Sequence, residues 1–132
     1  MNITDPIADM LTRIRNACKA KHKKVDIPSS KLKKSVAQAL LDSKYIANFV
    51  EVEDNRQNLL RIFLKYDKEN RSVVTGLKRI SKPGLRIYFK KENLKLLERQ
   101  LGMILLSTSK GILTDQQARN QKIGGEAICK VW

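Results

Sequence analysis

The stretch "MILLSTSKGILTDQQARNQKIGGEAICKVW", residues 103–132, carries strand, turn and helix signals in close succession. Its apolar run at 103–106 predicts a buried strand, which a loop of small hydroxyl residues follows. Thr114 and Gln117 have the spacing of a capping box, in which two side chains cap the first turn of a helix. We therefore expect a short helix over residues 115–120, set between strands.

The rest of this half of the chain is predicted to be mainly strand. Pro83 presets the φ of a turn, and we expect Gly84 to accept a positive φ there. Residues 93–101 are expected to form one or two helical turns that end at Gly102. The pair Gly124-Gly125 is expected to turn the chain. Strands are predicted over residues 73–80, 85–89 and 126–132.

The first half of the chain mixes helices and strands. Thr4, Asp5 and Pro6 have the order of a hydroxyl N-cap, an acid and a proline at a helix start. Apolar residues at helical spacing then continue to Cys18. Ser29 or Ser30 is predicted to cap a second helix, whose expected inward residues are Leu32, Val36, Ala39 and Leu40. Strands are expected at 25–28, 49–52 and 59–66, the last two joined by the polar turn 54–58.

The polar segment at 67–71 is the best candidate for a linker. The sequence therefore predicts an α+β fold with two small domains: an α-β-α-β-β N-terminal domain over 1–70, and a β-rich C-terminal domain with short helices over 71–132. A domain of this size buries only a marginal core by itself. We expect each half to depend on the other or on a partner.

The charge of the chain points to a polyanionic partner. Lys and Arg number 27 against 13 Asp and Glu, a formal net charge of +14. Residues 72–132 hold 12 basic and only 4 acidic side chains. Because such an excess opposes compact folding, nucleic acid is the first expected partner and a membrane surface the second. No apolar run approaches the roughly 18–20 residues of a membrane span, which argues against the membrane.

The sequence also bears on where the protein works. Its N-terminal residues have neither the pattern of a secretory signal nor that of an Arg-rich transit peptide. Cys18 and Cys129 are far apart and form no disulfide framework, which suits a reducing compartment. We therefore expect a cytoplasmic protein.

Two chemical motifs give competing interpretations. Ser107 and Lys110 spell the S-x-x-K of serine acyl-transferases, but the motif follows a predicted strand and its S-D-N and K-T-G companions are absent. Cys18 and His22 have the spacing of metal ligands on a helix, but Cys18 continues an apolar stripe and no third ligand is near. We expect no enzyme activity, no metal and no cofactor.

A run of lysines and one tyrosine are candidates for contact with nucleic acid. The lysines crowd a segment whose only acid is Asp26, where they form either a solvated surface or a phosphate contact. Tyr88, between Arg86 and Lys90, is either a half-buried sheet residue or a platform for stacking on a base. The lysines are Lys19, Lys21, Lys23, Lys24, Lys31, Lys33 and Lys34.

Five segments together resemble a known family. They are "TDPIADMLTRIRNA" at 4–17, "IPSSKLK" at 27–33, "GLKRISKPGLRIY" at 76–88, "STSKGILTDQQAR" at 107–119 and "GGEAIC" at 124–129. In order and spacing they resemble the bacterial small-subunit ribosomal protein family number eight. The resemblance implies binding to the central domain of small-subunit ribosomal RNA early in assembly, beside neighbouring small-subunit proteins. It also implies, for some members, repression of their own operon through a messenger RNA that copies the ribosomal site.

The resemblance also assigns residues to the RNA. Its main contacts fall on Ser107, Thr108 and Ser109, with Lys110 beside them. The resemblance also places further residues near the RNA: Arg86, Tyr88, Gly124, Gly125 and Glu126. In the N-terminal half the match to the family's contact positions is looser and falls on Ser30 and Lys31.

Elementary chemistry fits these assignments, because small hydroxyls and backbone N–H groups approach a sugar–phosphate backbone closely. Glu126 is expected to accept hydrogen bonds from base amino groups or to orient Lys110.

A DNA-binding architectural protein is the competing class, but no recognition-helix pattern is present. Relatives often have a proline and a glycine-rich turn where this chain reads "NLKLLERQLG" at 93–102.

Overall fold

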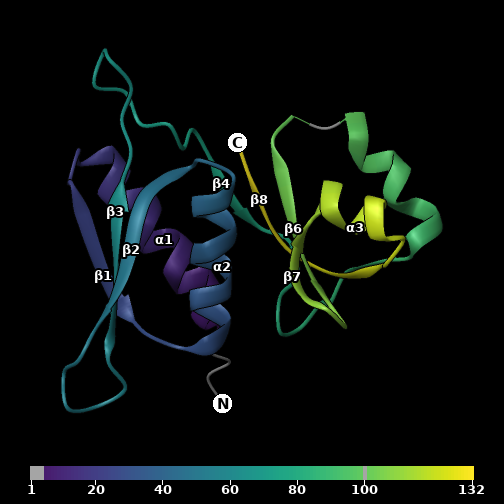
Figure 1. Cartoon of the computed structure of the whole chain (residues 1–132), viewed down its shortest axis with the longest axis horizontal. Helices are drawn as coiled ribbons and strands as arrows, with labels where there is room; N and C mark the ends of the chain where they lie inside the picture. The colour runs from purple at the N-terminus through teal and green to yellow at the C-terminus, as the bar shows by residue number, and fades with distance from the viewer. Residues whose placement is uncertain (1–4, 100) are drawn as a thin grey trace. The chain divides into compact units, whose positions relative to one another are not determined.

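The computed structural model describes residues 5–99 and 101–132. Its strands form two sheets, and together with the helices they make an α+β fold (Figure 1). The chain groups into two compact units. One unit holds Asp9–Thr75, and the other holds residues 5–8 with 76–132. The domain boundary near residue 70 stays a prediction, and each unit is described by itself below.

The first unit has the predicted element order α-β-α-β-β. Its antiparallel sheet has the strand order β1-β3-β2, and helices α1 and α2 lie on the same side of it (Figure 1). Leu60, Ile62 and Leu64 of β3 are buried in alternation with more exposed neighbours, as in a sheet covered on one face. The elements are α1 (Pro6–Lys19), β1 (Lys24–Pro28), α2 (Lys31–Asp42), β2 (Ile46–Val52) and β3 (Leu59–Leu64).

The helix starts follow local capping chemistry. Pro6 is the first residue of α1, where its missing N–H costs nothing, and the Asp5 carboxylate accepts a hydrogen bond from the Ala8 N–H at 3.1 Å. The predicted cap Thr4 lies outside the described residues. Of the two predicted caps of α2, Ser30 is the N-cap and accepts from the Lys33 N–H at 3.2 Å. Ser29 is buried and donates to Glu51 at 2.6 Å instead.

The predicted inward face of α2 is partly wrong. Val36 and Leu40 are buried as expected, but Leu32 is 42% exposed and Ala39 is only half-buried. Lys33 and Ala37 are buried in their place. Lys33 is tolerated because its ammonium donates to the Pro28 carbonyl at 3.0 Å, so the charged end has a partner where its aliphatic stem is covered.

The second unit is built on a five-stranded antiparallel sheet. Strand β8 is its centre: it pairs with β6 on one edge and with β4 and β5 on the other, while β7 pairs with β6. The elements are β4 (Leu77–Arg79), β5 (Tyr88–Phe89), η1 (Lys91–Arg99), β6 (Met103–Thr108), β7 (Gly111–Thr114), α3 (Asp115–Gln121) and β8 (Gly125–Val131).

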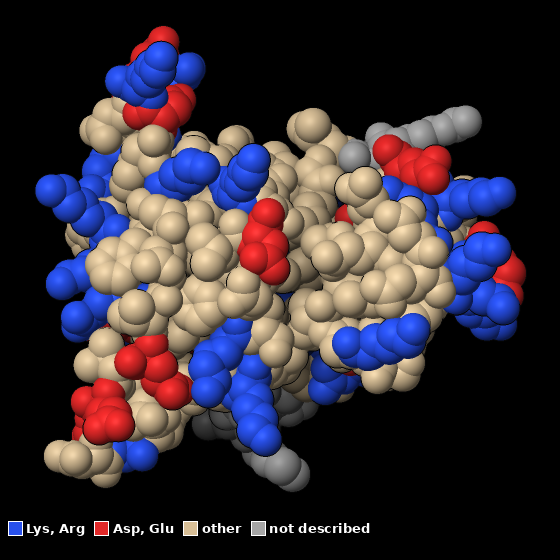
Figure 2. Space-filling model, viewed as in Figure 1, with Lys and Arg blue, Asp and Glu red and all other residues tan. Residues whose placement is uncertain are grey.

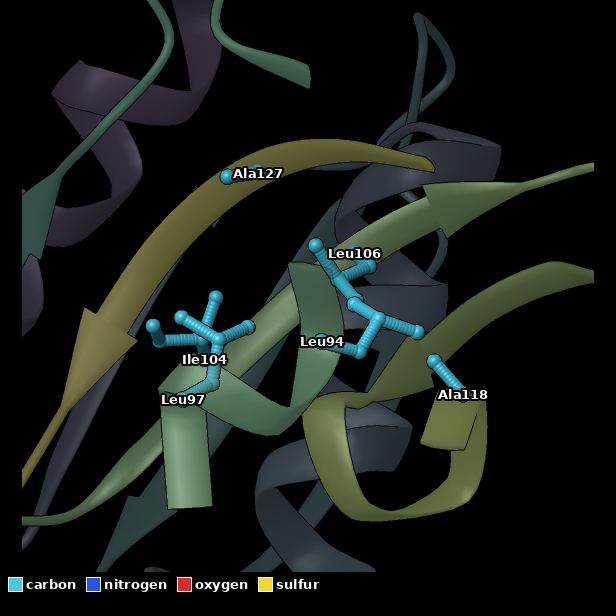
Figure 3. Close-up of a cluster of buried hydrophobic side chains, with 6 residues drawn as sticks. All are labelled: Leu94, Leu97, Ile104, Leu106, Ala118 and Ala127. Atoms are coloured by element: carbon cyan, nitrogen blue, oxygen red, sulfur yellow. The ribbon is translucent and has the colours of Figure 1, made fainter. Parts of the chain in front are cut away.

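The helical segments of this unit cover one face of the sheet. Their buried side chains converge with those of β6 and β8 in one apolar cluster (Figure 3). Segment η1 is a 3-10 helix, whose three residues per turn place Leu94 and Leu97 on the same side, facing the core. It begins at Lys91, earlier than expected, and the bend before β6 is at Gly102, with φ +89°. The cluster consists of Leu94, Leu97, Ile104, Leu106, Ala118 and Ala127.

Two predicted strands are shorter than expected: 73–80 contracts to β4 and 85–89 to β5. Ser81, between the two segments, is fully buried. Its hydroxyl donates to the Ile87 carbonyl at 3.1 Å and accepts from the Ile87 N–H at 2.9 Å, and the same carbonyl also accepts from the Ala127 N–H at 2.9 Å. Gly84 does not take the positive φ that we expected.

Three predicted features near the C-terminus have different outcomes. Half of the predicted hydroxyl loop 107–110 is strand, because β6 continues through Thr108, which pairs with Gly111, and Ser109 and Lys110 form the turn. The capping box of α3 is confirmed: the Thr114 N–H donates to the Gln117 side chain at 2.9 Å, and the Gln117 N–H donates to the Thr114 hydroxyl at 3.1 Å. The turn after α3 falls at Lys122, with φ 56°, and not at the glycine pair, of which Gly125 is the first residue of β8.

Candidate nucleic-acid interface

Three of the predicted site residues form one row across the sheet. Tyr88 of β5 pairs with Glu126 of β8, and Glu126 pairs in turn with Ser107 of β6. Adjacent strands lie about 4.8 Å apart and directly paired residues face the same side. Residues far apart in the chain are thus brought within roughly 10 Å of one another.

The row carries an exposed aromatic ring and a paired carboxylate. Tyr88 is 66% exposed, so the expectation of a half-buried sheet tyrosine is wrong. Arg86 Nη1 lies 3.0 Å from Glu126 Oε2. Arg86 therefore neutralises the acid on this surface. The predicted alternative, that Glu126 orients Lys110, finds no contact among the described residues.

The β6–β7 hairpin ends in a tight turn at one side of this row. Ser109 and Lys110 are exposed at its tip, and Ser107 is half-buried. The Thr108 hydroxyl donates to the Gly111 carbonyl at 2.8 Å and accepts from the Lys110 N–H at 3.1 Å. The hydroxyls of Ser107 and Ser109 have no partner in the described part of the chain. The turn therefore offers two unused hydroxyls and one ammonium.

The glycine pair has a packing role in this surface. A Cβ on Gly124 would come within 2.4 Å of the Phe89 carbonyl oxygen, and one on Gly125 within 2.4 Å of that of Ser107. Neither distance is found for real side chains. The two glycines let β8 approach the end of β5 and the hairpin closely.

The N-terminal candidates lie in the other unit. Ser30 is used as the cap of α2, and Lys31 is exposed in the first turn of that helix. Two lysines of the predicted cluster have partners within the protein while their side chains stay accessible. Lys34 lies 3.4 Å from Glu51, and Lys21 donates to the Asn70 carbonyl.

Burial removes Lys33 from the cluster. It is only 5% exposed, and burial lowers the pKa of its ammonium below the ordinary value. The other members stay candidates for phosphate contact, and those without a partner described above are all exposed: Lys19, Lys23, Lys24 and Lys31.

The competing motifs are placed as follows. Ser107 is on a strand and Lys110 in a turn, whereas the acyl-transferase arrangement requires a helix between them. Cys18 is buried and His22 exposed. Over residues 5–99 and 101–132, no group of three His, Cys, Asp or Glu side chains could hold a metal ion. No helix in the same ranges has the length and apolar character to cross a membrane.

Basic side chains are widely distributed over the protein. On the face drawn in Figure 2, Lys and Arg side chains project from the surface of both units, with acidic side chains between them. Lys90 and Lys91, which follow β5 directly, are exposed in addition to Lys110. This surface thus combines unused hydroxyls, an exposed ring and nearby cations, which are the groups that contact nucleic acid backbones and bases.

Comparison with known proteins decides the family. A family model described as "Ribosomal protein S8" matches residues 5–132. The chain belongs to the ribosomal protein S8 family. The small ribosomal subunit protein uS8 of Ruminiclostridium cellulolyticum is 56% identical over 132 residues, which cover 100% of both chains. Proteins of that name from Halothermothrix orenii and Shouchella clausii are 55% and 54% identical over the same full length.

Membership in the S8 family confirms the resemblance seen in the sequence and places the chain among the proteins of the small ribosomal subunit. The sequence did not reveal which side chains support the Tyr88 row from within the protein. Ser81 fixes Ile87, one residue before Tyr88, and the only signal was a serine beside a Lys-Pro-Gly turn. The assignment of individual residues to RNA contacts stays a prediction.

Proposed function

We propose that the chain is a structural, non-catalytic constituent of the small ribosomal subunit that binds directly to the central domain of small-subunit ribosomal RNA and supports subunit assembly. One observation carries the proposal: Tyr88, Glu126 and Ser107 form a single row beside the hairpin tip, in a chain whose residues 5–132 match a family of small-subunit proteins. Neighbouring small-subunit proteins are its further proposed partners, and the cytoplasm its proposed location.

Each part of the surface has a proposed task. The hydroxyls of Ser107 and Ser109 donate to phosphate or 2′-hydroxyl oxygens in a shallow groove. The exposed Tyr88 ring stacks on a base or sugar, which suits an irregular RNA element with unstacked bases. Arg86 screens Glu126, so that the carboxylate accepts from base amino groups without repelling the backbone. Exposed lysines on both units add attraction that does not depend on sequence.

The same groups support a second proposal, repression of translation from the chain's own operon. The hairpin tip reads the shape of an RNA through hydroxyls and backbone groups, and any messenger that copies the ribosomal site presents that shape. A transcript of the operon that displaces the ribosomal fragment from the protein would support this role. A transcript that does not compete would contradict it.

The direct test of the first proposal is a hydroxyl-radical footprint of the full-length protein on a central-domain RNA fragment. We expect one compact protected region, and a fragment from another ribosomal RNA domain as control should show none. The Ser109→Ala/Tyr88→Ala variant should lose the protection at RNA concentrations where the wild type gives it. Protection that is equal on both fragments would contradict specific binding.

A further inference from the structure

The Thr108 hydroxyl is engaged as both donor and acceptor within the hairpin turn. It donates to the Gly111 carbonyl at 2.8 Å and accepts from the Lys110 N–H at 3.1 Å. A hydroxyl has one hydrogen and two lone pairs. Its only hydrogen is therefore committed inside the protein, which sets Thr108 apart from Ser107 and Ser109.

This commitment limits what Thr108 offers to RNA. Phosphate oxygens accept hydrogen bonds and donate none, so a contact to phosphate needs a free donor. Thr108 would have to release Gly111 to provide one. Ser107 and Ser109, whose hydroxyls have no partner among the described residues, provide donors at no such cost.

The methyl group of Thr108 anchors the turn to the neighbouring strand. A Cβ on Gly125 would lie 2.9 Å from Thr108 Cγ2 and 2.4 Å from the Ser107 carbonyl oxygen. The methyl group thus lies over the bare backbone of Gly125 in β8. Any side chain at position 125 would push the hairpin away from the strand that carries Glu126.

The far side of the turn depends on Gly111. Its φ is +97°, a conformation that residues with a Cβ adopt only with strain, whereas the space around it is open. A left-handed glycine is common at the end of a short hairpin connection. Thr108 and Gly111 therefore fix the tip from its two ends.

We propose that Thr108 is a positioning residue of the RNA-binding surface and not one of its contacts: its hydroxyl and methyl hold Ser107, Ser109 and Lys110 in the orientation in which they meet RNA. The inference rests on the proposed function, since it assigns the means by which that surface is kept in shape. It revises the sequence-based expectation that Thr108 touches the RNA.

The test compares three variants of the full-length protein in two measurements. Thr108→Val keeps the methyl group and loses the hydroxyl, Thr108→Ser keeps the hydroxyl, and Gly111→Ala strains the same turn without removing a polar group. The first measurement is the ¹⁵N heteronuclear NOE of residues 109–111 in the free protein, which reports picosecond-to-nanosecond motion. The second is the affinity for the central-domain RNA fragment. Thr75→Val, at an exposed threonine, is the matched control.

We expect Thr108→Val to lower the NOE of the tip and to weaken RNA binding by roughly fivefold, the equivalent of one hydrogen bond. Gly111→Ala should do both as well, and Thr108→Ser, which loses only the methyl group, should show a smaller loss of both. Weaker binding by Thr108→Val with an unchanged tip NOE would overturn the inference, because it would indicate direct contact. Unchanged binding would overturn it too. If the wild type itself does not prefer the ribosomal fragment, the proposed function fails and the inference with it.

Discussion

Arg79 Nε lies 3.0 Å from Asp5 Oδ2, in an ion pair whose side chains are only 10% and 17% exposed. The same carboxylate caps the first turn of α1 at Ala8, and Arg79 Nη1 also donates to the Ile128 carbonyl at 2.7 Å. A residue at the start of the first helix is thus fixed to a strand residue 74 positions later. Both residues belong to the unit that contains 76–132.

This pair predicts acid-sensitive stability. Burial by itself raises the pKa of the Asp5 carboxyl, but the hydrogen bonds from Arg79 and from the Ala8 N–H outweigh burial, so the folded-state pKa lies below the ordinary value. Its stabilising contribution is therefore complete above the unfolded-state pKa near 4 and lost as the pH falls below it. The pKa values of Asp26, beside Arg61, and of Asp67, beside Arg71, are lowered as well. These two carboxylates therefore also contribute stability that is lost in acid.

We expect Asp5→Asn to lower the free energy of unfolding at pH 7 by about 2 kcal/mol, because it leaves Arg79 without its charged partner. The variant should also lose less stability than the wild type between pH 5 and 3. Denaturant unfolding at several pH values measures both effects. Asp9→Asn, which breaks the exposed Asp9–Arg13 pair, is the control and should cost under about 0.5 kcal/mol. Equal costs for the two variants would contradict the role of the buried pair.

Thr114→Ala is predicted to destabilise the protein by about 1 kcal/mol. It removes the side chain that accepts from the Gln117 N–H at 3.1 Å. Thermal unfolding of this variant should shift to lower temperature by a few degrees, while Thr75→Ala at an exposed position should not shift. An unchanged midpoint for Thr114→Ala would show that the capping box adds no stability.

Arg86→Gln is predicted to weaken RNA binding by about tenfold. The change removes a cation and leaves the Glu126 carboxylate uncompensated on the surface that we propose to face phosphate. The double variant Arg86→Gln/Glu126→Gln should recover part of the loss, since the repelling charge is gone. Filter binding of the two single variants and the double variant measures the coupling. If the double variant binds more weakly than Arg86→Gln alone, Glu126 contributes a contact that outweighs its charge.

Lys23→Gln with Lys31→Gln is predicted to weaken binding to all RNAs about equally. Both lysines are exposed, and the slope of log affinity against log salt should become shallower by roughly one for each phosphate that a lysine no longer neutralises. The wild type itself should lose roughly 10³ in affinity between 50 and 200 mM salt if about six phosphates are bound. Lys33 is unsuitable for this test, because it is buried against Pro28. A flat salt dependence for the wild type would contradict a phosphate-dominated interface.

The features predicted correctly from sequence depend on residues close together in the chain. Ser30 with Lys33 and Thr114 with Gln117 are caps formed within four positions, so the sequence contains both partners side by side. The first unit's element order follows from apolar spacing in the same way. These local rules were sufficient for the α+β class and for most element bounds in the first half.

The errors arise where a partner outside the local pattern decides the outcome. Lys33 is buried because the Pro28 carbonyl lies within reach of its ammonium, although helical spacing favoured Leu32. Ser81 is buried in a predominantly strand region, and its hydroxyl bonds both backbone groups of Ile87, six residues later. Lys122 takes a left-handed φ that the neighbouring glycines were expected to supply.

The candidate site shows the same division. The family resemblance named the hairpin residues and Tyr88 one by one, because each lies in a short recognisable segment. Only the register of β5, β8 and β6 shows that Tyr88, Glu126 and Ser107 are neighbours. That pairing joins segments far apart in the chain, so no local pattern contains it.

The central claim is that the hairpin tip and Tyr88 select the cognate RNA, and the ratio of affinities for the central-domain fragment and a random RNA of equal length tests it most directly. This ratio should be measured by filter binding at two salt concentrations for the wild type, Ser109→Ala/Tyr88→Ala and Lys23→Gln/Lys31→Gln. We expect Ser109→Ala/Tyr88→Ala to lower the ratio, because it should weaken binding to the central-domain fragment by of order 1–3 kcal/mol more than binding to the random RNA. The slope of log affinity against log salt should change little. The lysine variant should lower the slope and leave the ratio nearly unchanged. A ratio that falls with the lysine variant and not with Ser109→Ala/Tyr88→Ala would contradict the account.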